Sequence, residues 1–294
     1  MIKEKKPETA LEYIKVSAEY LCKNNIKDAR LNAELLLCDV LKCGRMDLYL
    51  NFDKPLTKDE VNLFRTFLKR RQSHEPIQYI TGKAYFFGYE FKVKRGILIP
   101  RPETEILVEK VIQDILQTGR KDVSIFEIGS GSGCISISII AELIKENVHA
   151  DIVSIDISDE ALNLCEENSK RILQGNNSVR FMKTDIFRLE NLPGKFDYIV
   201  SNPPYISSSD YLKLEPEVRQ YEPEEALTDG NDGLSFFRRI FGIVSKDKFK
   251  GKVFCEIGFM QKDSICNLLN ETGFLDYIFY KDYAGIDRIL EVRI

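Results

Sequence analysis

Apolar residues recur every three or four positions through the first ninety residues, which is the spacing of amphipathic helices. Two capping-box pairs mark helix starts in this region, and they are Thr9 with Glu12 and Thr57 with Glu60. Between these pairs Asp28 is placed to cap a further helix, which Gly44 could close. The pattern predicts a small helical bundle over residues 1–83.

The next segment, residues 84–99, has an apolar spacing nearer two, which is typical of strands. Gly88 lies in the middle of the run AYFFGYEFKV and predicts the turn of a β-hairpin in this linker. Pro100 and Pro102 follow, and proline restricts the backbone and removes hydrogen-bond donors. We therefore expect an irregular joint at these prolines, and then a helix that runs to about Gln117.

In residues 100–294, strand-like apolar runs alternate with helical patterns. The strand candidates are 123–128, 150–155, 178–182, 196–200 and 252–257, with two more near Tyr277 and Ile289. Such alternation predicts an α/β fold, Rossmann-like, with a mostly parallel sheet and helices on both faces. Ligands of such sheets bind at the carboxyl ends of the strands, so candidate site residues are expected there.

A glycine-rich loop follows the first of these strands. Its candidate cofactor-binding residues are Glu127, Gly129, Ser130, Gly131, Ser132 and Gly133. Glycines allow a sharp turn and a close approach of the backbone to a ligand, and the helix that starts next offers unpaired N–H groups. The spacing is GxGxG rather than the GxGxxG of dinucleotide-binding enzymes, and the Lys-Ser/Thr pair of a P-loop is absent from the sequence here.

The next two strands each lead into an aspartate. Asp156 ends the second strand, where its carboxylate could accept hydrogen bonds from both hydroxyls of a ribose. Asp185 follows the third strand, beside Ile186, where it could meet the edge of an adenine. Either aspartate alone could be a helix cap or a solvated turn. With the glycine loop they lie at the ends of three successive strands, which resembles the S-adenosylmethionine site of class I methyltransferases.

The fourth strand runs into the tetrapeptide Asn202-Pro203-Pro204-Tyr205, the candidate catalytic residues. Each proline fixes its φ angle and lacks an N–H, so the loop presents carbonyl groups and the Asn202 amide in a preset geometry. The Asn202 side-chain oxygen and the Pro203 carbonyl could hold both N–H bonds of an amide and aim its nitrogen at a methyl donor. Tyr205 would pack against the planar target. No general base is evident, and a proline-stiffened turn without a catalytic role is the alternative.

Composition and charge narrow the class of protein. Hydrophobic residues make up 44% and charged residues 30% of the chain, as in folded globular proteins. No run approaches the roughly 18 apolar residues that span a bilayer, and the first residues lack the apolar core of a signal peptide, so we expect a cytoplasmic protein without membrane contact. Seven scattered cysteines without a CxxC pair indicate reduced thiols, and with two histidines no metal site is predicted.

The net charge of −4 is unevenly distributed. Residues 1–90 carry +3 and the remainder carries −7. A mildly basic segment ahead of an acidic body argues against a protein whose main role is to grip a phosphate backbone, so stable binding of nucleic acid is not expected.

Several motifs together resemble the HemK-type peptide chain release factor glutamine methyltransferases, the PrmC subfamily of the protein N(5)-glutamine methyltransferases, over essentially the full length. They are Gln78–Gly82, Leu98–Glu105, the loop ending Gly133-Cys134-Ile135, Asn202–Tyr205, Glu256-Ile257-Gly258 with Gln261, and Gly285-Ile286-Asp287-Arg288. The NPPY tetrapeptide is shared with DNA and RNA amino-methyltransferases, whereas the LIPRPETE segment is far more selective.

The resemblance implies an N-terminal helical domain that recognises the substrate, joined by a hairpin to a class I methyltransferase domain. It implies that S-adenosylmethionine contacts Gly129–Gly133, Asp156 and Asn202, and that Asn202–Tyr205 form the pocket for the glutamine of the Gly-Gly-Gln motif of peptide chain release factors. Many members have an aromatic residue after the third-strand aspartate, where this chain has Ile186 followed by Phe187. We expect the protein to act as a monomer.

Three other functions compete with this interpretation. A glutamine methyltransferase of a ribosomal protein would share the fold and NPPY, although the helical region and LIPRPETE favour release factors. A nucleic-acid amino-methyltransferase would be expected to carry a strongly basic surface, which the first ninety residues lack. A binding module without activity would be expected to lose Asn202 or the loop glycines, and all of them are present.

Overall fold

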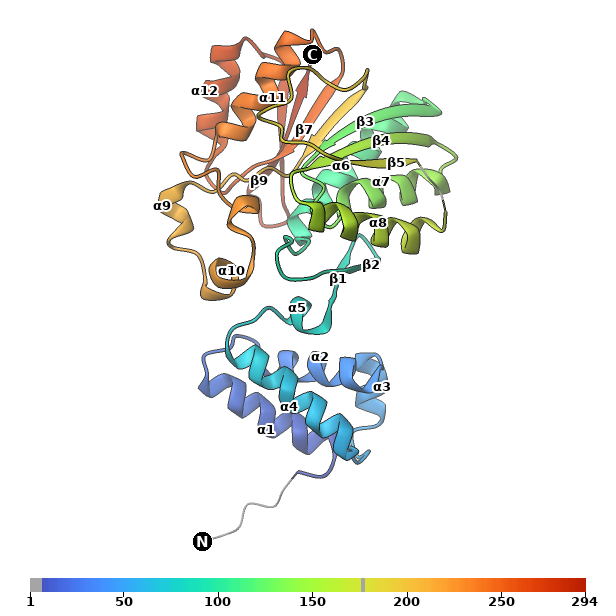
Figure 1. Cartoon of the computed structure of the whole chain (residues 1–294), viewed down its shortest axis with the longest axis vertical. Coiled ribbons are helices and arrows are strands. Elements are labelled where there is room, and N and C mark those ends of the chain that lie inside the picture. Colours follow the sequence, from blue (N-terminus) through green and yellow to red (C-terminus); the bar gives the residue numbers. More distant parts are fainter. Residues whose placement is uncertain (1–6, 176–177) are drawn as a thin grey trace. The chain divides into compact units, whose positions relative to one another are not determined.

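The computed structural model describes residues 7–175 and 178–294. The chain forms two compact units (Figure 1). The helical unit consists of the described residues up to Gly82 together with Pro216–Tyr221, and the sheet unit consists of Lys83–Glu215 and Glu222–Ile294 without the two residues left undescribed. The chain therefore passes between the units at three points.

The helical unit contains α1 (Ala10–Lys23), α2 (Ala29–Leu41), α3 (Arg45–Leu50), α4 (Lys58–Gln72), α5 (Ile77–Thr81) and α10 (Pro216–Tyr221). Both predicted capping boxes are confirmed, since Thr9 and Thr57 each accept a hydrogen bond from the backbone N–H three residues on, and the glutamate there accepts one from the threonine N–H. The apolar faces of α1, α2 and α4 meet around the fully buried Phe64. The predicted helical bundle is therefore present.

Helix α10 joins this bundle although it is distant in sequence. Arg71 at the end of α4 donates from Nη2 to Glu217 Oε2 at 2.7 Å, and its side chain is almost fully buried. The Tyr221 hydroxyl donates to the Ser73 carbonyl oxygen at 2.6 Å. These contacts fasten a segment that lies between β6 and α11 in the sequence to the end of α4.

One predicted helix end in this unit is wrong, and one predicted cap lacks its side-chain hydrogen bond. Asp28 does precede α2, but its backbone is left-handed at φ 48° and its side chain makes no capping hydrogen bond. The same helix ends before Gly44, because Lys42 adopts a left-handed conformation at φ 51° and its N–H bonds back to the carbonyls of Asp39 and Cys38. Gly44 is instead the N-cap residue of the next helix, α3, with an extended backbone at φ −76°.

The sheet unit is built on a seven-stranded sheet in the order β5-β4-β3-β6-β7-β9-β8. The strands are β3 (Asp122–Ile128), β4 (His149–Asp156), β5 (Val179–Lys183), β6 (Tyr198–Ser201), β7 (Lys252–Glu256), β8 (Tyr277–Lys281) and β9 (Asp287–Arg293). The pairs from β5 to β7 are parallel, whereas β9 runs antiparallel to both β7 and β8. The strand order reverses direction beside β3, which is where such sheets bind ligands.

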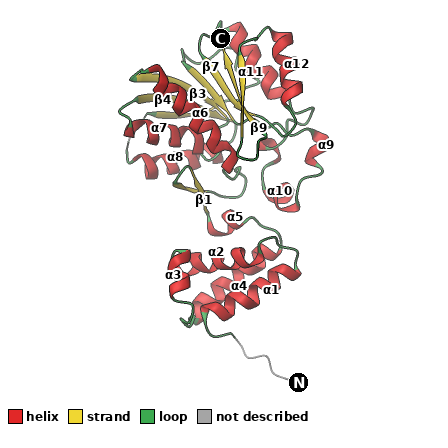
Figure 2. Cartoon of the chain, turned by 180° about the vertical axis from the view of Figure 1, so that it is seen from behind, coloured by secondary structure: helices red, strands yellow, loops and turns green. Residues whose placement is uncertain are grey.

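Helices cover both faces of the sheet, as predicted (Figure 2). Helices α6 (Pro102–Thr118), α7 (Cys134–Lys145) and α8 (Asp159–Leu173) lie on one face, and α11 (Ser235–Lys246) and α12 (Lys262–Thr272) lie on the other. The sequence of β3 explains this arrangement, because side chains of neighbouring strand residues point to opposite faces of the sheet. Ile125 packs in the apolar core beside α6, α7 and α8, and Phe126 packs in the core beside α11 and α12.

The predicted hairpin forms between β1 (Lys83–Phe86) and β2 (Tyr89–Lys92), with Gly88 in the turn. Helix α6 begins at Pro102 itself, so only one of the two prolines lies outside regular structure. Proline suits the first helical position because the N–H it lacks would have no partner there. Between β6 and α11 the sheet unit adds α9 (Ser208–Tyr211) and the 3-10 helix η1 (Glu224–Ala226). In the two described ranges, none of the helices combines the length and the apolar character that crossing a bilayer requires.

Candidate active site

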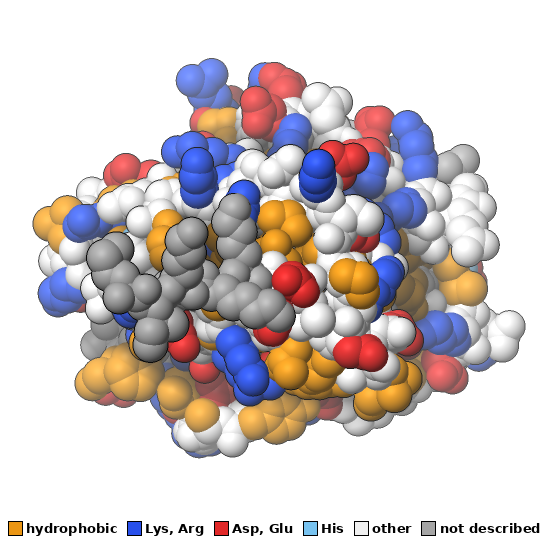
Figure 3. Space-filling model, turned by 90° about the horizontal axis from the view of Figure 1, so that it is seen from below, with side chains coloured by type: hydrophobic (Ala, Val, Ile, Leu, Met, Phe, Trp, Pro, Cys, Tyr) orange, Lys and Arg blue, Asp and Glu red, His pale blue; other side chains and the backbone are white. Residues whose placement is uncertain are grey.

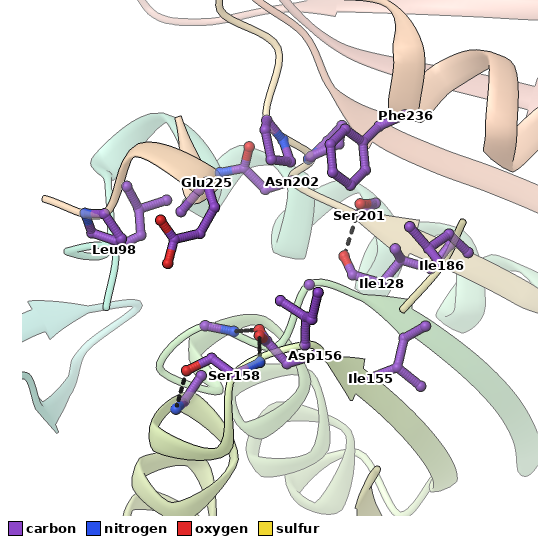
Figure 4. A pocket seen from close by; sticks show the side chains of 18 of the residues that line it. Leu98, Ile128, Ile155, Asp156, Ser158, Ile186, Ser201, Asn202, Glu225 and Phe236 are labelled. Carbon is purple, nitrogen blue, oxygen red and sulfur yellow. Dashed lines mark hydrogen bonds between the residues drawn. The ribbon is translucent and has the colours of Figure 1, made fainter. Parts of the chain in front are cut away.

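A cavity of about 310 Å³ opens in the sheet unit at the carboxyl ends of β3, β4 and β6 (Figure 4). Its size falls in the usual range of ligand pockets, about 300 to 1,000 Å³. Eight residues proposed from the sequence line it: Gly129, Gly131, Asp156, Asp185, Ile186, Asn202, Pro203 and Pro204. The structure thus brings together side chains that are as far as 75 residues apart in the sequence.

The glycine loop forms one wall through its backbone. Gly129, Gly131 and Gly133 all have positive φ angles, which side chains rarely adopt. A Cβ at Gly133 would also lie 2.7 Å from Ile137 Cδ1, whereas a Cβ at Gly131 would meet nothing within 4 Å. The loop therefore turns sharply into α7 and leaves open space beside Gly131.

Asp156 at the end of β4 orders this loop. Its Oδ2 accepts from the Gly131 N–H at 2.9 Å and its Oδ1 accepts from the Ser158 N–H at 2.9 Å, as the dashed lines in Figure 4 mark. Burial raises the pKa of Asp156, and the two backbone donors oppose that shift. Each carboxylate oxygen can accept a second hydrogen bond, so Asp156 can still bind a pair of hydroxyl groups.

An aromatic pair supplies an apolar wall beyond Asp185. Phe187, 47% exposed, meets Phe236 of α11 edge to face, with ring centroids 4.9 Å apart, and both residues line the cavity. Asp185 itself accepts a hydrogen bond from the Phe187 N–H at 2.9 Å. Sequence reasoning missed Phe236, because only the packing of α11 against the sheet brings it to this wall.

Four residues proposed to bind the cofactor lie behind the cavity wall, and they are Glu127, Ser130, Ser132 and Gly133. Glu127 is 1% exposed and accepts from the Ser154 hydroxyl, which also pairs with the Ser130 hydroxyl at 2.6 Å. Burial raises the pKa of Glu127 to about 7. The side chains of Glu127 and Ser130, linked through Ser154, therefore brace the loop from beneath.

The NPPY tetrapeptide lies across the cavity from Asp156 and is held by a buried polar chain. The Asn202 amide donates from Nδ2 to Thr104 Oγ1 at 3.0 Å, and Thr104 donates to Glu256 Oε2 at 2.6 Å. The Tyr205 hydroxyl donates to Glu256 Oε1 at 3.0 Å. Thr104 comes from the first turn of α6 and Glu256 from the end of β7, within two motifs recognised in the sequence without a role for either side chain.

Gln261 fixes the backbone on the far side of this tetrapeptide. Its Nε2 donates to the Tyr205 carbonyl at 3.2 Å and to the Gly233 carbonyl at 2.8 Å. Its Oε1 accepts from the Gly258 N–H at 2.9 Å. One side chain therefore ties together the three loops that follow β6, precede α11 and follow β7.

The segment from Glu222 to Ala226 forms the remaining wall. Glu222 is buried, accepts from the Ile99 N–H at 3.2 Å and forms an ion pair with Arg101. Its anchored position lets Pro223, Glu225 and Ala226 line the cavity, and Figure 4 shows Glu225 on the same side as Asn202. No group of three or more potential metal-ligating side chains occurs in the ranges that the structure describes.

Comparisons with known proteins decide the family. Family models for the PrmC N-terminal domain and for a methyltransferase domain match residues 12–82 and 120–274. A release factor glutamine methyltransferase of Fusobacterium nucleatum subsp. nucleatum is 38% identical over 285 residues, which are 96% of this chain and 78% of that protein. The chain belongs to the release factor glutamine methyltransferase family. A second member, from Geobacter sulfurreducens, is 38% identical over 94% of this chain and 93% of its own length.

A solved structure is also similar in sequence. It is a release-factor-specific protein-(glutamine-N5) methyltransferase of Alicyclobacillus acidocaldarius, 29% identical, with a TM-score of 0.38 over 69% of this chain and 98% of the other. Family membership confirms the resemblance seen in the motifs, with a class I methyltransferase fold that follows the helical bundle in the sequence. The protein is an enzyme, and S-adenosylmethionine is its methyl donor.

Proposed function

We propose that this protein transfers a methyl group from S-adenosylmethionine to the side-chain amide nitrogen of the glutamine in the Gly-Gly-Gln motif of peptide chain release factors. The observation that carries the proposal is the fixed amide of Asn202, whose NH2 end is held by Thr104 while its oxygen is left to accept. An amide substrate is the ligand that such an acceptor suits. Relatives named for this activity match nearly the whole chain.

The cavity fits the methyl donor. Asp156 offers acceptors for the two ribose hydroxyls, Phe187 and Phe236 offer flat apolar surface for an adenine, and the open space at Gly131 admits the amino-acid end. When bound, S-adenosylmethionine supplies a methyl group on a positively charged sulfur. The residues of this chain hold that group near Asn202 and exclude water through an apolar lining.

A glutamine amide reacts poorly because its nitrogen shares a lone pair with the carbonyl, as the rotation barrier of roughly 18 to 20 kcal/mol in amides indicates. The Asn202 oxygen and the Pro203 carbonyl would accept both N–H bonds and point the lone pair at the methyl carbon. The nitrogen–carbon bond forms as the carbon–sulfur bond breaks, and the electron pair of that bond stays on sulfur. One N–H proton then leaves to solvent.

The helical unit is proposed to recognise the release factor. Its surface carries exposed apolar side chains such as Met46 and Leu50, at 72% and 75% exposure. On the face in Figure 3, Lys and Arg side chains are interspersed with Asp, Glu and apolar ones. Such a mixed surface suits a protein partner better than a phosphate backbone. We also propose that the enzyme works as a monomer in the cytoplasm, where release factors act.

Incubation of the purified protein with labelled S-adenosylmethionine and candidate substrates tests the proposal. Mass spectrometry should find one added methyl group on the Gly-Gly-Gln glutamine of a release factor and none after that glutamine is changed to alanine. Asn202→Ala should lower turnover by about 100-fold or more, as loss of a transition-state hydrogen bond does elsewhere. Methylation of a ribosomal protein or of nucleic acid instead would overturn the proposal.

A further inference from the structure

The hydrogen bonds behind the NPPY tetrapeptide run in one direction. Glu256 is 1% exposed, and each of its carboxylate oxygens receives a proton donor, Thr104 at one and Tyr205 at the other. Burial beside Glu256 raises the pKa of Tyr205 well above its ordinary value, so this hydroxyl remains a donor. Burial raises the pKa of Glu256, and the Thr104 and Tyr205 hydroxyls and the positive charge of Arg288 oppose that shift. In this geometry both carboxylate oxygens of Glu256 accept a hydrogen bond.

This arrangement makes the Thr104 hydroxyl the donor of its hydrogen bond to Glu256. A hydroxyl has one proton and two lone pairs, so a threonine that donates to Glu256 can only accept from any other partner. Thr104 is 2% exposed, and its hydroxyl also contacts the side-chain amide of Asn202. The NH2 end of the Asn202 amide must consequently face Thr104, which turns the oxygen of that amide away.

The direction of the Asn202 amide matters for the reaction. The target nitrogen carries two N–H donors, so only an oxygen at this position can accept from it. If Asn202 were reversed, its own NH2 group would face that of the target and leave both donors unpaired in an apolar cavity. The two orientations of the Asn202 amide occupy the same volume, so the shape of the pocket alone does not distinguish them.

We infer that Thr104 and Glu256 are positioning residues that set the direction of the Asn202 amide, so that its side-chain oxygen accepts the N–H of the amide to be methylated. The inference rests on the proposed function for its role in turnover. The direction of the hydrogen bonds can be measured without any substrate.

Substitutions at Thr104 separate the effect of its hydrogen bond to Asn202 from the effect of its packing. Thr104→Val keeps the shape and removes the hydroxyl, whereas Thr104→Ser keeps the hydroxyl. Thr118→Val is the matched control, since Thr118 lies at the other end of α6 and its hydroxyl bonds to the Ile115 carbonyl. In the full chain with bound S-adenosylhomocysteine, the Asn202 side-chain resonance is identified by its loss in Asn202→Ala. Hydrogen exchange of its NH2 protons is then followed by NMR.

One Asn202 NH2 proton should exchange slowly in the wild type, in Thr104→Ser and in Thr118→Val, and at least 10-fold faster in Thr104→Val. Unchanged exchange in Thr104→Val would overturn the inference whatever the substrate is. This readout remains decisive if no release factor is methylated, an outcome that would count against the proposed function alone.

Turnover on the release factor gives the second measurement. Thr104→Val should lower kcat roughly 10- to 100-fold, the range that small misplacements of a positioning group produce, while the Kd for S-adenosylmethionine stays within a few fold. Thr104→Ser should recover most of the loss. In the background of Asn202→Ala, Thr104→Val should have almost no further effect, because it acts through Asn202. Multiplicative losses in the double variant would show an independent structural role and overturn the inference.

Discussion

At the scale of single residues, Asp156 shows how one carboxylate can order a loop and still receive a ligand. Both of its oxygens hold backbone N–H groups, yet each has capacity for one more donor. Sequence reasoning could place this side chain, because an aspartate at the end of a buried strand is visible as a pattern. The backbone partners that fix it could not be predicted, since they depend on how the glycine loop folds back over β4.

Asp156→Ala should weaken the binding of S-adenosylmethionine by roughly 10- to 100-fold, because hydrogen bonds to a charged acceptor contribute about 1.5 to 3 kcal/mol. Isothermal calorimetry measures the change. Asp151→Ala is the control, as Asp151 lies on the same strand with an exposed carboxylate paired to Arg180. Equal losses in both variants would mean that the effect of Asp156→Ala is not specific to ligand contact.

Glu127 makes stability depend on pH. The unfolded chain releases the Glu127 proton near 4.5, whereas the folded chain holds it to a pKa of about 7, so folding in this window takes up a proton. The stabilising contribution of protonated Glu127 to folding is complete below pH 4.5 and is lost as the pH rises through about 7. Between pH 5 and pH 8, Glu127→Gln should gain about 2 to 3 kcal/mol of unfolding free energy relative to the wild type. Urea denaturation across this range checks it, and a constant difference would contradict the prediction.

At the scale of elements, the periodicity of the sequence predicted the helices and strands whose formation depends on residues close together in the sequence. The strand expected over 123–128 is β3, Asp122–Ile128, and both capping boxes form because each needs only residues three apart. The helix end predicted at Gly44 is wrong because the left-handed backbone of Lys42 ends α2 earlier, whereas α2 starts after Asp28 as predicted but without a side-chain capping bond. The partners of Asn202 also escaped prediction, since Thr104 and Glu256 meet it only through the order of the strands.

The loop before α11 offers a test of such tertiary constraints. Gly230 and Gly233 both have positive φ, but a Cβ at Gly233 would lie 2.3 Å from the Tyr205 carbonyl oxygen, and one at Gly230 would meet nothing within 4 Å. Gly233→Ala should therefore displace the NPPY backbone, lower kcat by about 10-fold or more and destabilise the fold by about 1 to 3 kcal/mol.

Gly230→Ala controls for backbone strain alone. It should reduce stability by about 1 to 2 kcal/mol, the penalty of a left-handed backbone with a side chain, and leave kcat within about two-fold. Thermal denaturation and steady-state rates distinguish the two variants. Similar kinetics for both would mean that the close approach of Gly233 to Tyr205 has no bearing on turnover.

At the scale of the whole molecule, helix α10 belongs to the helical unit although the residues after it line the cavity. A break in the Arg71–Glu217 ion pair should loosen α10 and the following segment. Glu217→Ala is expected to speed amide hydrogen exchange over residues 216–226 and to leave the exchange of β3 unchanged, as mass spectrometry can measure. Faster exchange throughout the chain would indicate general destabilisation instead.

The inclusion of α10 in the helical unit also affects how such enzymes can change in evolution. A helical unit that ended at Gly82 could be exchanged between relatives as one uninterrupted stretch of gene. Here the unit includes a second piece, Pro216–Tyr221, encoded more than 130 codons downstream. A recombinant that acquires a new N-terminal bundle without a compatible second piece would leave Arg71 without Glu217 as its partner. If the helical unit recognises the substrate, as proposed, a change of target should therefore involve both stretches evolving together.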